Sequence, residues 1–296
     1  MSKHQTIAFI GFGEAAQAFC EGWGGTPAFG VRAYDIKTDE EPSAAGKRDD
    51  YRRFGVVGCG ATGDAIGGAD IVISVVTADQ ALNAASDAAA WISPGTFFFD
   101  CNSVAPSTKQ AAAKVISAAG GRYIDVAVMA PVRPALLAVP LLLSGPFAEE
   151  GERLLKALGF HGQVIDGGVG AASAIKMIRS IMIKGLEALT AECLLSARAA
   201  GVEEEVLASL DASFPGWGWR GRADYNLDRM LVHGLRRAAE MRESAQTAAY
   251  FGQAGTMASA TAGWQQHLGA LHLSPLPDGF AAKADAILAA TGISKS

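Results

Sequence analysis

The first half of the chain alternates short apolar runs with helix-like stretches. One apolar run, residues 71–76, is unbroken and β-branched, which is typical of a strand buried on both faces. Residues 39–50 are charged and polar and predict a loop that leads into a short helix ending near Phe54. Strands that alternate with helices indicate a parallel sheet with helices on both faces. The strands are predicted at Thr6–Ile10, Gly30–Tyr34, Ile71–Val76, Thr96–Phe99 and Tyr123–Val128.

The pattern changes after the glycine-rich segment 159–170. No strand alternation follows, and long stretches rich in Ala and Leu predict helices instead. We therefore expect two domains, an α/β domain with a doubly wound parallel sheet over residues 1–164 and an all-α domain over residues 165–296. The predicted helices of the second domain span Ala171–Ala200, Glu203–Ser213, Leu227–Ala254, Thr256–Ala270 and Phe280–Thr291.

Composition narrows the possible partners. The 25 basic and 30 acidic residues give a net charge of −5, which argues against nucleic acid and anionic membranes as partners. The four cysteines are widely spaced and the histidines show no triad spacing, so neither a disulfide framework nor a metal site is predicted. The N-terminus lacks the pattern of a signal peptide, and the most apolar run, residues 135–143, is far below the roughly 20 residues that span a bilayer. We expect a cytoplasmic protein.

The first strand is followed by a G-x-G-x-x-A turn that opens a helix. Gly11 permits the tight turn, Gly13 lets a pyrophosphate approach the backbone, and the small Ala16 lets the helix pack close to the strand. The N–H groups at the helix N-terminus then face the phosphates. This context predicts a Rossmann-like dinucleotide site, although a plain glycine-rich strand–helix turn is the alternative. The predicted cofactor contacts here are Gly11, Phe12, Gly13, Glu14, Ala15 and Ala16.

Asp35 ends the second strand, 19 residues after Ala16. A carboxylate at this point can accept hydrogen bonds from both ribose hydroxyls of NAD and repels the 2′-phosphate of NADP. The neighbouring Ile36 is included in the predicted cofactor site, and Lys37 leaves NADP possible because a cation tolerates that phosphate. The alternative is an Asp that only caps a turn. We expect NAD as the cofactor.

Two further segments close parallel strands, where ligands of open α/β sheets bind. Val75, Val76 and Thr77 close the strand at 71–76 and are predicted cofactor contacts. Asn102 and Ser103 follow the next strand; Asn102 is assigned to both the cofactor and the catalytic set, and Ser103 is expected to hold the substrate. The alternative is that this pair caps the helix that begins near Pro106.

Lys176, Ser180 and Lys184 recur every four residues and therefore share one face of the predicted helix. Their neighbours are mostly apolar, which is typical of a buried helix. Burial lowers the pKa of a lysine toward the range of a general acid or base. The alternative is a solvated face with extended lysines.

The glycine turn, the Asn102–Ser103 segment before Pro106, the stretch from Asp125 to Val132 and the glycine-rich entry to the Lys176 helix follow one another in a known order. In this order the whole chain resembles the β-hydroxyacid dehydrogenase superfamily, which includes 3-hydroxyisobutyrate dehydrogenase and 6-phosphogluconate dehydrogenase. It is most similar to the phosphogluconate-dehydrogenase-like NAD-binding branch, which carries a Met-x-Pro-Val variant of the third segment.

The resemblance implies that Lys176 takes the proton of a substrate hydroxyl while a hydride passes to the nicotinamide. The superfamily typically has asparagine where this chain has Ser180, which is expected to assist Lys176. It has backbone-donor glycines where this chain has Ala130 and Pro131, so Arg133 is expected to bind a substrate carboxylate instead. Met129, Ala130, Pro131 and Lys184 complete this part of the predicted substrate site.

Residues 215–222, PGWGWRGR, place two Trp and two Arg in what is predicted to be a glycine-rich loop. Trp217 and Trp219 are predicted to line the substrate mouth. The alternative is a loop between helices that packs on the core or on a second subunit.

The sequence thus predicts an NAD(P)-dependent oxidoreductase acting on the CH–OH group of a hydroxy acid or related small molecule. An imine reductase and a catalytically inactive dinucleotide-binding protein are the alternatives. The resemblance also implies a homodimer formed through the helical domain.

Overall fold

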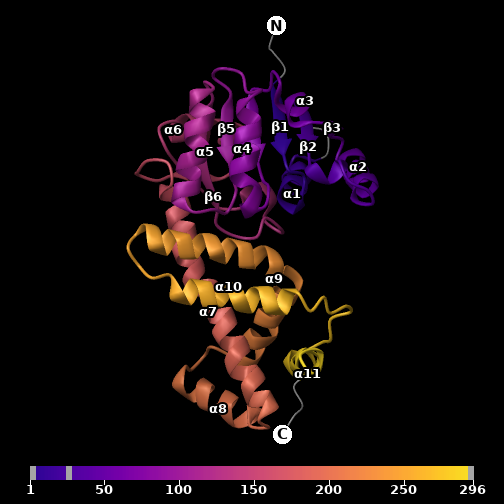
Figure 1. Cartoon of the computed structure of the whole chain (residues 1–296), viewed down its shortest axis with the longest axis vertical. Coiled ribbons are helices and arrows are strands. Elements are labelled where there is room, and N and C mark those ends of the chain that lie inside the picture. The colour runs from indigo at the N-terminus through magenta and orange to yellow at the C-terminus, as the bar shows by residue number, and fades with distance from the viewer. Residues whose placement is uncertain (1–4, 25–28, 293–296) are drawn as a thin grey trace. The chain divides into compact units, whose positions relative to one another are not determined.

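The computed structural model describes residues 5–24 and 29–292 and divides the chain into two compact units, Met1–Met177 and Ile178–Ser296. The division falls within one long helix, α7 (Ala171–Ala199) (Figure 1). The first residues of α7, up to Met177, belong to the first unit and the others belong to the second. The first unit is α/β and the second is helical, as the sequence predicts. The assignment of the functional domains to residues 1–164 and 165–296 stays a prediction.

The described part of the first unit contains one eight-stranded sheet in the order β3-β2-β1-β4-β5-β6-β7-β8. The crossover after β3 places β1 beside β4, which is the switch point where open α/β sheets bind ligands. The five predicted strands pair in parallel, as expected, and the additional strand β7 runs antiparallel to β6. The strands are β1 (Thr6–Ile10), β2 (Gly30–Tyr34), β3 (Val57–Gly58), β4 (Ile71–Ser74), β5 (Phe97–Asp100), β6 (Arg122–Val128), β7 (Leu141–Ser144) and β8 (Gly162–Val164).

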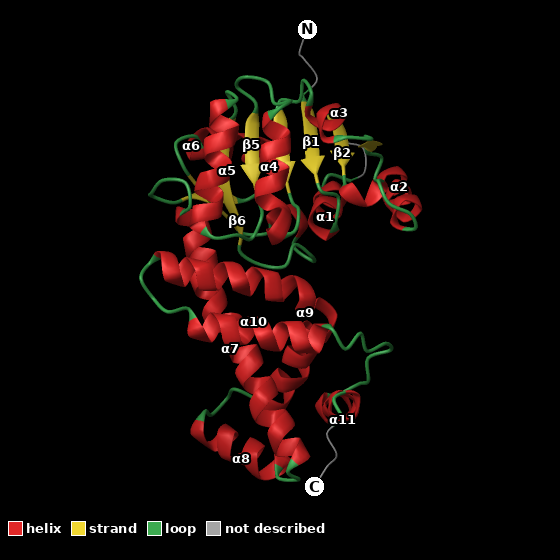
Figure 2. Ribbon diagram, viewed as in Figure 1, coloured by secondary structure: helices red, strands yellow, loops and turns green. Residues whose placement is uncertain are grey.

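Helices cover both faces of this sheet (Figure 2). In β1, Ile7 and Phe9 pack into one core with α1, α2 and α6, whereas Ala8 and Ile10 pack into the other with α3, α4 and α5. Alternate residues of a strand face opposite sides, so β1 is buried on both. The helices are α1 (Glu14–Gly22), α2 (Ser43–Arg53), α3 (Thr62–Ile66), α4 (Ala81–Ala89), α5 (Pro106–Ala118) and α6 (Ala148–Ala157); 3₁₀ turns span Ile36–Thr38, Ala78–Gln80 and Leu136–Ala138.

Several boundaries differ from the sequence prediction. The loop expected over residues 39–50 is shorter, because α2 already begins at Ser43, just after Pro42. The short strands β3 and β8 were not predicted, since two or three residues give no usable periodicity. Strand β8 lies within the glycine-rich segment 159–170. Strand β7 was also not predicted as a strand.

The second unit is built from the rest of α7 with α8 (Glu203–Ser213), α9 (Trp219–Tyr250), α10 (Thr256–Gly269) and α11 (Phe280–Ala290). Helices α9 and α10 approach very closely: a Cβ at Gly234 would lie 2.8 Å from the Cα of Gly269. Helix α9 begins eight residues before the predicted start at Leu227. The predicted loop 215–222 is therefore wrong from Trp219 onward, because these residues form the first turns of α9.

Helix α7 is not buried on most sides, contrary to the expectation from its apolar sequence. Its side chains at Ile178, Met182, Ile183 and Leu189 are between 42% and 65% exposed. The spacing of apolar residues shows that a helix has an apolar face, but it does not show what packs against that face. An exposed apolar face and a core face therefore look the same in sequence. Among residues 5–24 and 29–292, no helix is long and apolar enough to span a membrane.

Candidate active site

The glycine turn between β1 and α1 has the geometry that the fingerprint predicts. Gly11 has a φ of +83°, and a Cβ there would lie 2.8 Å from the Val75 carbonyl oxygen, so only glycine fits against the end of β4. Its N–H donates to the Tyr34 carbonyl at 2.8 Å. Gly13, by contrast, has no atom within 4 Å of where its Cβ would be. This open side next to the start of α1 fits a pyrophosphate.

Both the backbone N–H and the backbone carbonyl of Phe12 form hydrogen bonds with side chains. Its N–H donates to Asp35 Oδ2 at 2.7 Å, and its carbonyl accepts from the Lys47 ammonium at 2.8 Å. The other Asp35 oxygen accepts from the Lys37 N–H at 3.0 Å. Asp35 therefore fixes the turn, and each carboxylate oxygen keeps a lone pair that a ribose hydroxyl can use. Lys47 was not predicted, because its helix was read as a loop.

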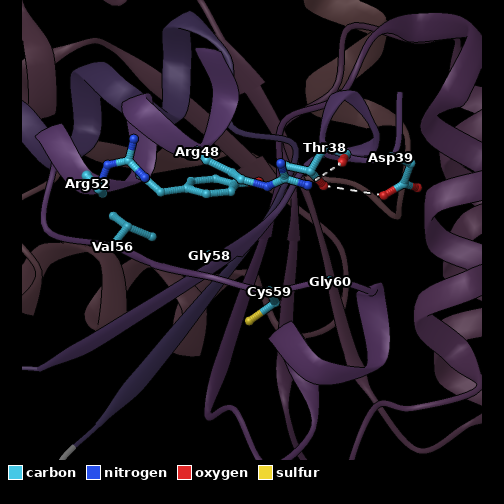
Figure 3. A pocket seen from close by; sticks show the side chains of 9 residues that line it. Thr38, Asp39, Arg48, Arg52, Val56, Gly58, Cys59 and Gly60 are labelled. Atoms are coloured by element: carbon cyan, nitrogen blue, oxygen red, sulfur yellow. Dashed lines mark hydrogen bonds between the residues drawn. The ribbon is translucent and has the colours of Figure 1, made fainter. Parts of the chain in front are cut away.

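A surface pocket of about 450 Å³ opens beyond Asp35 (Figure 3). Its lining includes the cations Arg48 and Arg52 and the Asp39 carboxylate. Asp39 accepts a hydrogen bond from the Tyr34 hydroxyl at 2.6 Å. The pocket lies just past the carboxyl end of β2, the position that the adenosine half of a dinucleotide takes in this type of sheet.

Asn102 ties the ends of β4 and β5 together. Its Oδ1 accepts from the Val76 N–H at 2.7 Å, and its Nδ2 donates to the Ser74 hydroxyl at 2.9 Å. The side chain is buried. The alternative of a helix cap is wrong, because α5 has Ala105 at its N-cap and no side-chain cap. Asn102 instead sets the distance between the predicted cofactor loop and the Ser103 loop.

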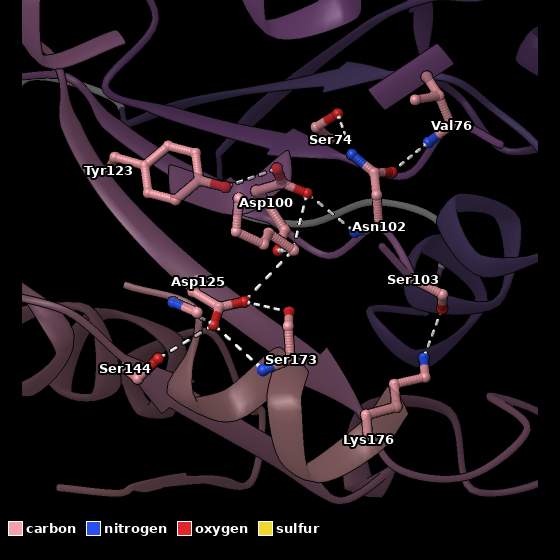
Figure 4. A network of polar contacts seen from close by, with 12 residues as sticks. Ser74, Val76, Asp100, Asn102, Ser103, Tyr123, Asp125, Ser144, Ser173 and Lys176 are labelled. Carbon is pink, nitrogen blue, oxygen red and sulfur yellow. Dashed lines mark hydrogen bonds and ion pairs between the residues drawn. The ribbon is translucent and has the colours of Figure 1, made fainter. Parts of the chain in front are cut away.

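Lys176 and Ser103 meet at the carboxyl ends of the strands. The Lys176 ammonium donates to the Ser103 hydroxyl at 2.6 Å, and both belong to the first unit (Figure 4). Lys176 is half-buried, so it is desolvated in part and still reachable. The neighbouring Cys101 is no nucleophile at neutral pH, because desolvation raises the pKa of its thiol to about 12.

Asp125 at β6 holds the first turn of α7. Its Oδ2 accepts from the N–H groups of Gly170 and Ser173, both at 3.1 Å, and its Oδ1 accepts from the Ser173 hydroxyl at 2.6 Å. Ser144 on β7 donates to the same Oδ2 and accepts from the Ala172 N–H. These bonds satisfy helix N–H groups that have no partner within the helix. They hold the helix one turn before Lys176.

The residues predicted to bind the substrate are dispersed. Met129, Ala130 and Pro131 directly follow β6, with Ala130 and Pro131 exposed. Arg133 forms a two-bond contact with Glu21, at 2.8 and 3.1 Å to one oxygen, so its cation already has a partner on α1. A role for Arg133 in binding a carboxylate stays a prediction.

The remaining predicted residues lie in the second unit. Lys184 is buried, pairs with Glu240 at 3.1 Å and donates to the Ser180 hydroxyl at 3.2 Å. Trp217 and Trp219 stack on each other with ring centroids 5.1 Å apart, and Arg222 covers the Trp217 ring. Trp219 also packs against the core of the second unit, which matches the alternative of a segment packed on the core. Contacts of these four residues with substrate stay predictions.

A doubly wound sheet with a G-x-G-x-x-A turn at its switch point defines a dinucleotide-binding protein. Residues 6–170 match the NAD binding domain of 6-phosphogluconate dehydrogenase, and residues 197–268 match a domain of unknown function, DUF1932. The chain belongs to the β-hydroxyacid dehydrogenase superfamily, as its resemblance implies. This is a superfamily of NAD(P)-binding oxidoreductases.

Three known proteins illustrate the similarity. A conserved hypothetical protein from Sinorhizobium meliloti 1021 is 38% identical, with 98% of this chain and 97% of that one covered and a TM-score of 0.73. An NAD-dependent L-serine dehydrogenase of Pseudomonas aeruginosa is 28% identical over 180 residues, 56% of this chain and 59% of that enzyme. A Mycobacterium tuberculosis 3-hydroxyisobutyrate dehydrogenase, solved with L-serine, shares the fold at 19% identity, 96% and 99% coverage and a TM-score of 0.70.

Proposed function

We propose that this protein oxidises the CH–OH group of a small 3-hydroxy acid, or reduces the corresponding carbonyl, with NAD as cofactor and Lys176 as general acid and base. The contact between Lys176 and Ser103 carries the proposal. It sets an amine and a hydroxyl 2.6 Å apart at the carboxyl ends of parallel strands, in the unit that holds the glycine turn. The P. aeruginosa and M. tuberculosis relatives support a β-hydroxy acid as substrate class.

The glycine turn is suited to the cofactor because Gly13 faces open space, where a pyrophosphate can lie, while Gly11 packs against Val75. Residues 11–16 would hold the pyrophosphate, Asp35 the ribose, and the segment 75–77 with Asn102 the nicotinamide half. When bound, the nicotinamide accepts or gives a hydride. Asp35 favours NAD over NADP because its carboxylate repels a 2′-phosphate.

Lys176 moves the proton. In the oxidation, its neutral amine takes the proton of the substrate hydroxyl at Nζ, and in the reduction the ammonium returns it. Ser103 accepts a hydrogen bond from Nζ, and its own hydroxyl hydrogen is then directed at the substrate oxygen. In this proposal the substrate oxygen forms one hydrogen bond with Lys176 Nζ and one with the Ser103 hydroxyl.

The test is turnover of 3-hydroxy acids, among them L-serine and 3-hydroxyisobutyrate, with NAD⁺ and with NADP⁺. Lys176→Met keeps the length of the side chain and removes the amine, so we expect kcat to fall by at least about 100-fold. Lys114→Met, which replaces an exposed lysine on α5, is the matched control and should keep wild-type kcat.

Three results would overturn the proposal. Full turnover by a folded Lys176→Met protein removes the assigned acid and base. Dinucleotide binding without turnover on the whole panel favours the inactive binding protein, and reduction of a cyclic imine in place of the hydroxy acids favours the imine reductase.

We also propose that the protein is a homodimer formed through the second unit. The support is the row of apolar side chains of α7 at Ile178, Met182 and Leu189, which lie on one side of the helix and are exposed in a single chain. Exposed apolar side chains that share one helix face are typical of an interaction site.

A further inference from the structure

Lys109 is the central group of a fully buried polar cluster that includes Asp100 and Asp125. Figure 4 shows these two carboxylates beside the segments that carry Ser103 and Lys176. Lys109 lies on the inner face of α5 and is 0% exposed. Its ammonium donates to the Asp100 carbonyl at 2.5 Å and to Asp100 Oδ1 at 2.9 Å, and lies 3.4 Å from Asp125 Oδ1. The three protons of the ammonium thus have three oxygen partners.

Both carboxylates of this cluster are also 0% exposed. The Tyr123 hydroxyl donates to Asp100 Oδ2 at 2.7 Å. Burial alone would lower the pKa of Lys109, but the charges of Asp100 and Asp125 outweigh it and raise that pKa above its ordinary value. Replacing a buried ion cluster with apolar residues of similar size is often neutral or even stabilises a fold. The stability of the folded chain therefore does not by itself account for two carboxylates and a lysine at this place.

The first arm of the cluster leads to the Ser103 loop. Asp100 Oδ1 accepts from the Asn102 N–H at 3.0 Å, directly before Ser103. Asn102 in turn holds Val76 and Ser74. The position of Lys109 therefore fixes the path of the chain from β5 to Ser103.

The second arm leads to Lys176. Asp125 accepts from the hydroxyl and N–H of Ser173 and from the Gly170 N–H. Helix α7 fits tightly here, because a Cβ at Gly170 would lie 2.9 Å from Pro106 Cβ. Ser173 lies three residues before Lys176, so the Asp125 carboxylate sets where the helix presents the amine.

We propose that Lys109 is a positioning residue that sets the Lys176–Ser103 distance by binding both carboxylates, one attached to each partner of the pair. This inference deepens the proposed function and rests on it for its consequence in catalysis. Whether Lys109 holds Lys176 in place can be measured without any turnover. Lys109 itself is sealed from the site, so it takes no part in the proton transfer.

The experiment compares wild type with the double variant Lys109→Met/Asp100→Asn. This variant keeps the formal charge of the cluster at −1, because it removes one cation and one anion together. The amide oxygen that Asp100→Asn introduces can still accept from the Asn102 N–H, so that bond does not depend on the lost charge. Lys114→Met on the exposed face of the same helix is the control. A brief pulse of an amine-acetylating reagent followed by mass spectrometry reports the accessibility of Lys176, with the exposed Lys156 as internal reference.

We expect acetylation of Lys176 to rise about tenfold in the double variant relative to Lys156, because its hydrogen bond to Ser103 is no longer enforced. We expect kcat to fall about tenfold to 100-fold while the Kd for the dinucleotide changes by less than about threefold. Wild-type acetylation of Lys176 in a folded double variant would overturn the proposal.

Ser173→Ala is the second variant, in case the double variant does not fold. It removes one bond from Asp125 and leaves every charge in place, and we expect a rise in Lys176 acetylation of about threefold. No rise would likewise contradict the proposal. If wild type shows no turnover on any hydroxy acid, the proposed function fails, while the acetylation result still decides whether Lys109 positions Lys176.

Discussion

The Lys176 ammonium lies 2.6 Å from the Ser103 hydroxyl, although 73 residues separate them in the chain. Ser103 comes from the loop after β5 and Lys176 from the second turn of α7. Two polar groups from distant segments that meet at the carboxyl end of a parallel sheet form the kind of pair that binds a substrate oxygen. The first prediction tests this pair directly.

Replacing Ser103 with alanine removes the acceptor for Lys176 and one contact to the substrate oxygen. We expect kcat for the hydroxy acid to fall about tenfold, which corresponds to the loss of one hydrogen bond in the transition state. The dinucleotide Kd should stay unchanged. The exposed Ser107→Ala on the first turn of α5 is the control. Equal kcat in Ser103→Ala and wild type would remove Ser103 from the site.

The glycine turn offers a matched pair of substitutions. Gly13→Ala introduces a methyl group into open space, so we expect an unchanged Tm and a dinucleotide Kd weakened at least about tenfold, because the methyl group meets the pyrophosphate. Gly11→Ala meets the Val75 carbonyl and requires a positive φ, so it should lower Tm as well. Isothermal titration and thermal unfolding measure both effects. If Gly13→Ala bound the dinucleotide as tightly as wild type, the pyrophosphate would have to bind away from Gly13.

Cofactor preference depends on the charge of Asp35. In wild type we expect NADH to bind more tightly than NADPH, as measured by fluorescence titration of both. Asp35→Asn keeps an oxygen for the Phe12 N–H and removes the repulsion, so the ratio of the two Kd values should shift toward NADPH by about tenfold. Asp278→Asn, at an exposed position of the second unit, is the control for loss of a carboxylate. Tighter NADPH binding by wild type would reassign the site to Lys37 or a neighbour.

Tyr123 makes the fold sensitive to alkaline pH. Burial, followed by the charges of Asp100 and Asp125, raises the pKa of its hydroxyl well above 10. The unfolded chain releases this proton above about pH 10 and the folded chain does not, so the free energy of unfolding falls as the pH rises above that value.

We expect Tyr123→Phe to make this fall shallower by about 1.4 kcal/mol per pH unit, the contribution of one proton. Denaturant unfolding between pH 9 and 11 measures the slope. Tyr225→Phe, at an exposed position of α9, controls for loss of a hydroxyl. The same slope in Tyr123→Phe and wild type would contradict the prediction.

The apolar face of α7 predicts the oligomeric state. Met182→Glu places a charge in the middle of this face, so sedimentation should change from a dimer in wild type to a monomer. Leu82→Glu, at an exposed leucine of α4, should remain a dimer. A wild-type monomer would show that the face has another function.

Local sequence was enough to predict the fold class and the glycine turn. The strands β1 and β2 and the helices α7 and α8 lie within a residue of their predicted bounds, because apolar periodicity and the glycine and proline signals act over a few neighbouring residues. The superfamily followed from the order of four short motifs. The helix face suggested a buried lysine, and the resemblance to the superfamily assigned Lys176 as the amine of the site.

Tertiary structure decided the contacts between distant segments. The packing of β5, β6, α5 and α7 brings Lys176 to Ser103 and places Lys109 between two carboxylates. The pairing of Arg133 with Glu21 depends on where α1 packs. A buried lysine on an apolar helix face and an exposed one have the same local pattern, because the partners that stabilise the charge come from elsewhere in the chain. The sequence determined which elements form, and packing decided which of their polar groups meet.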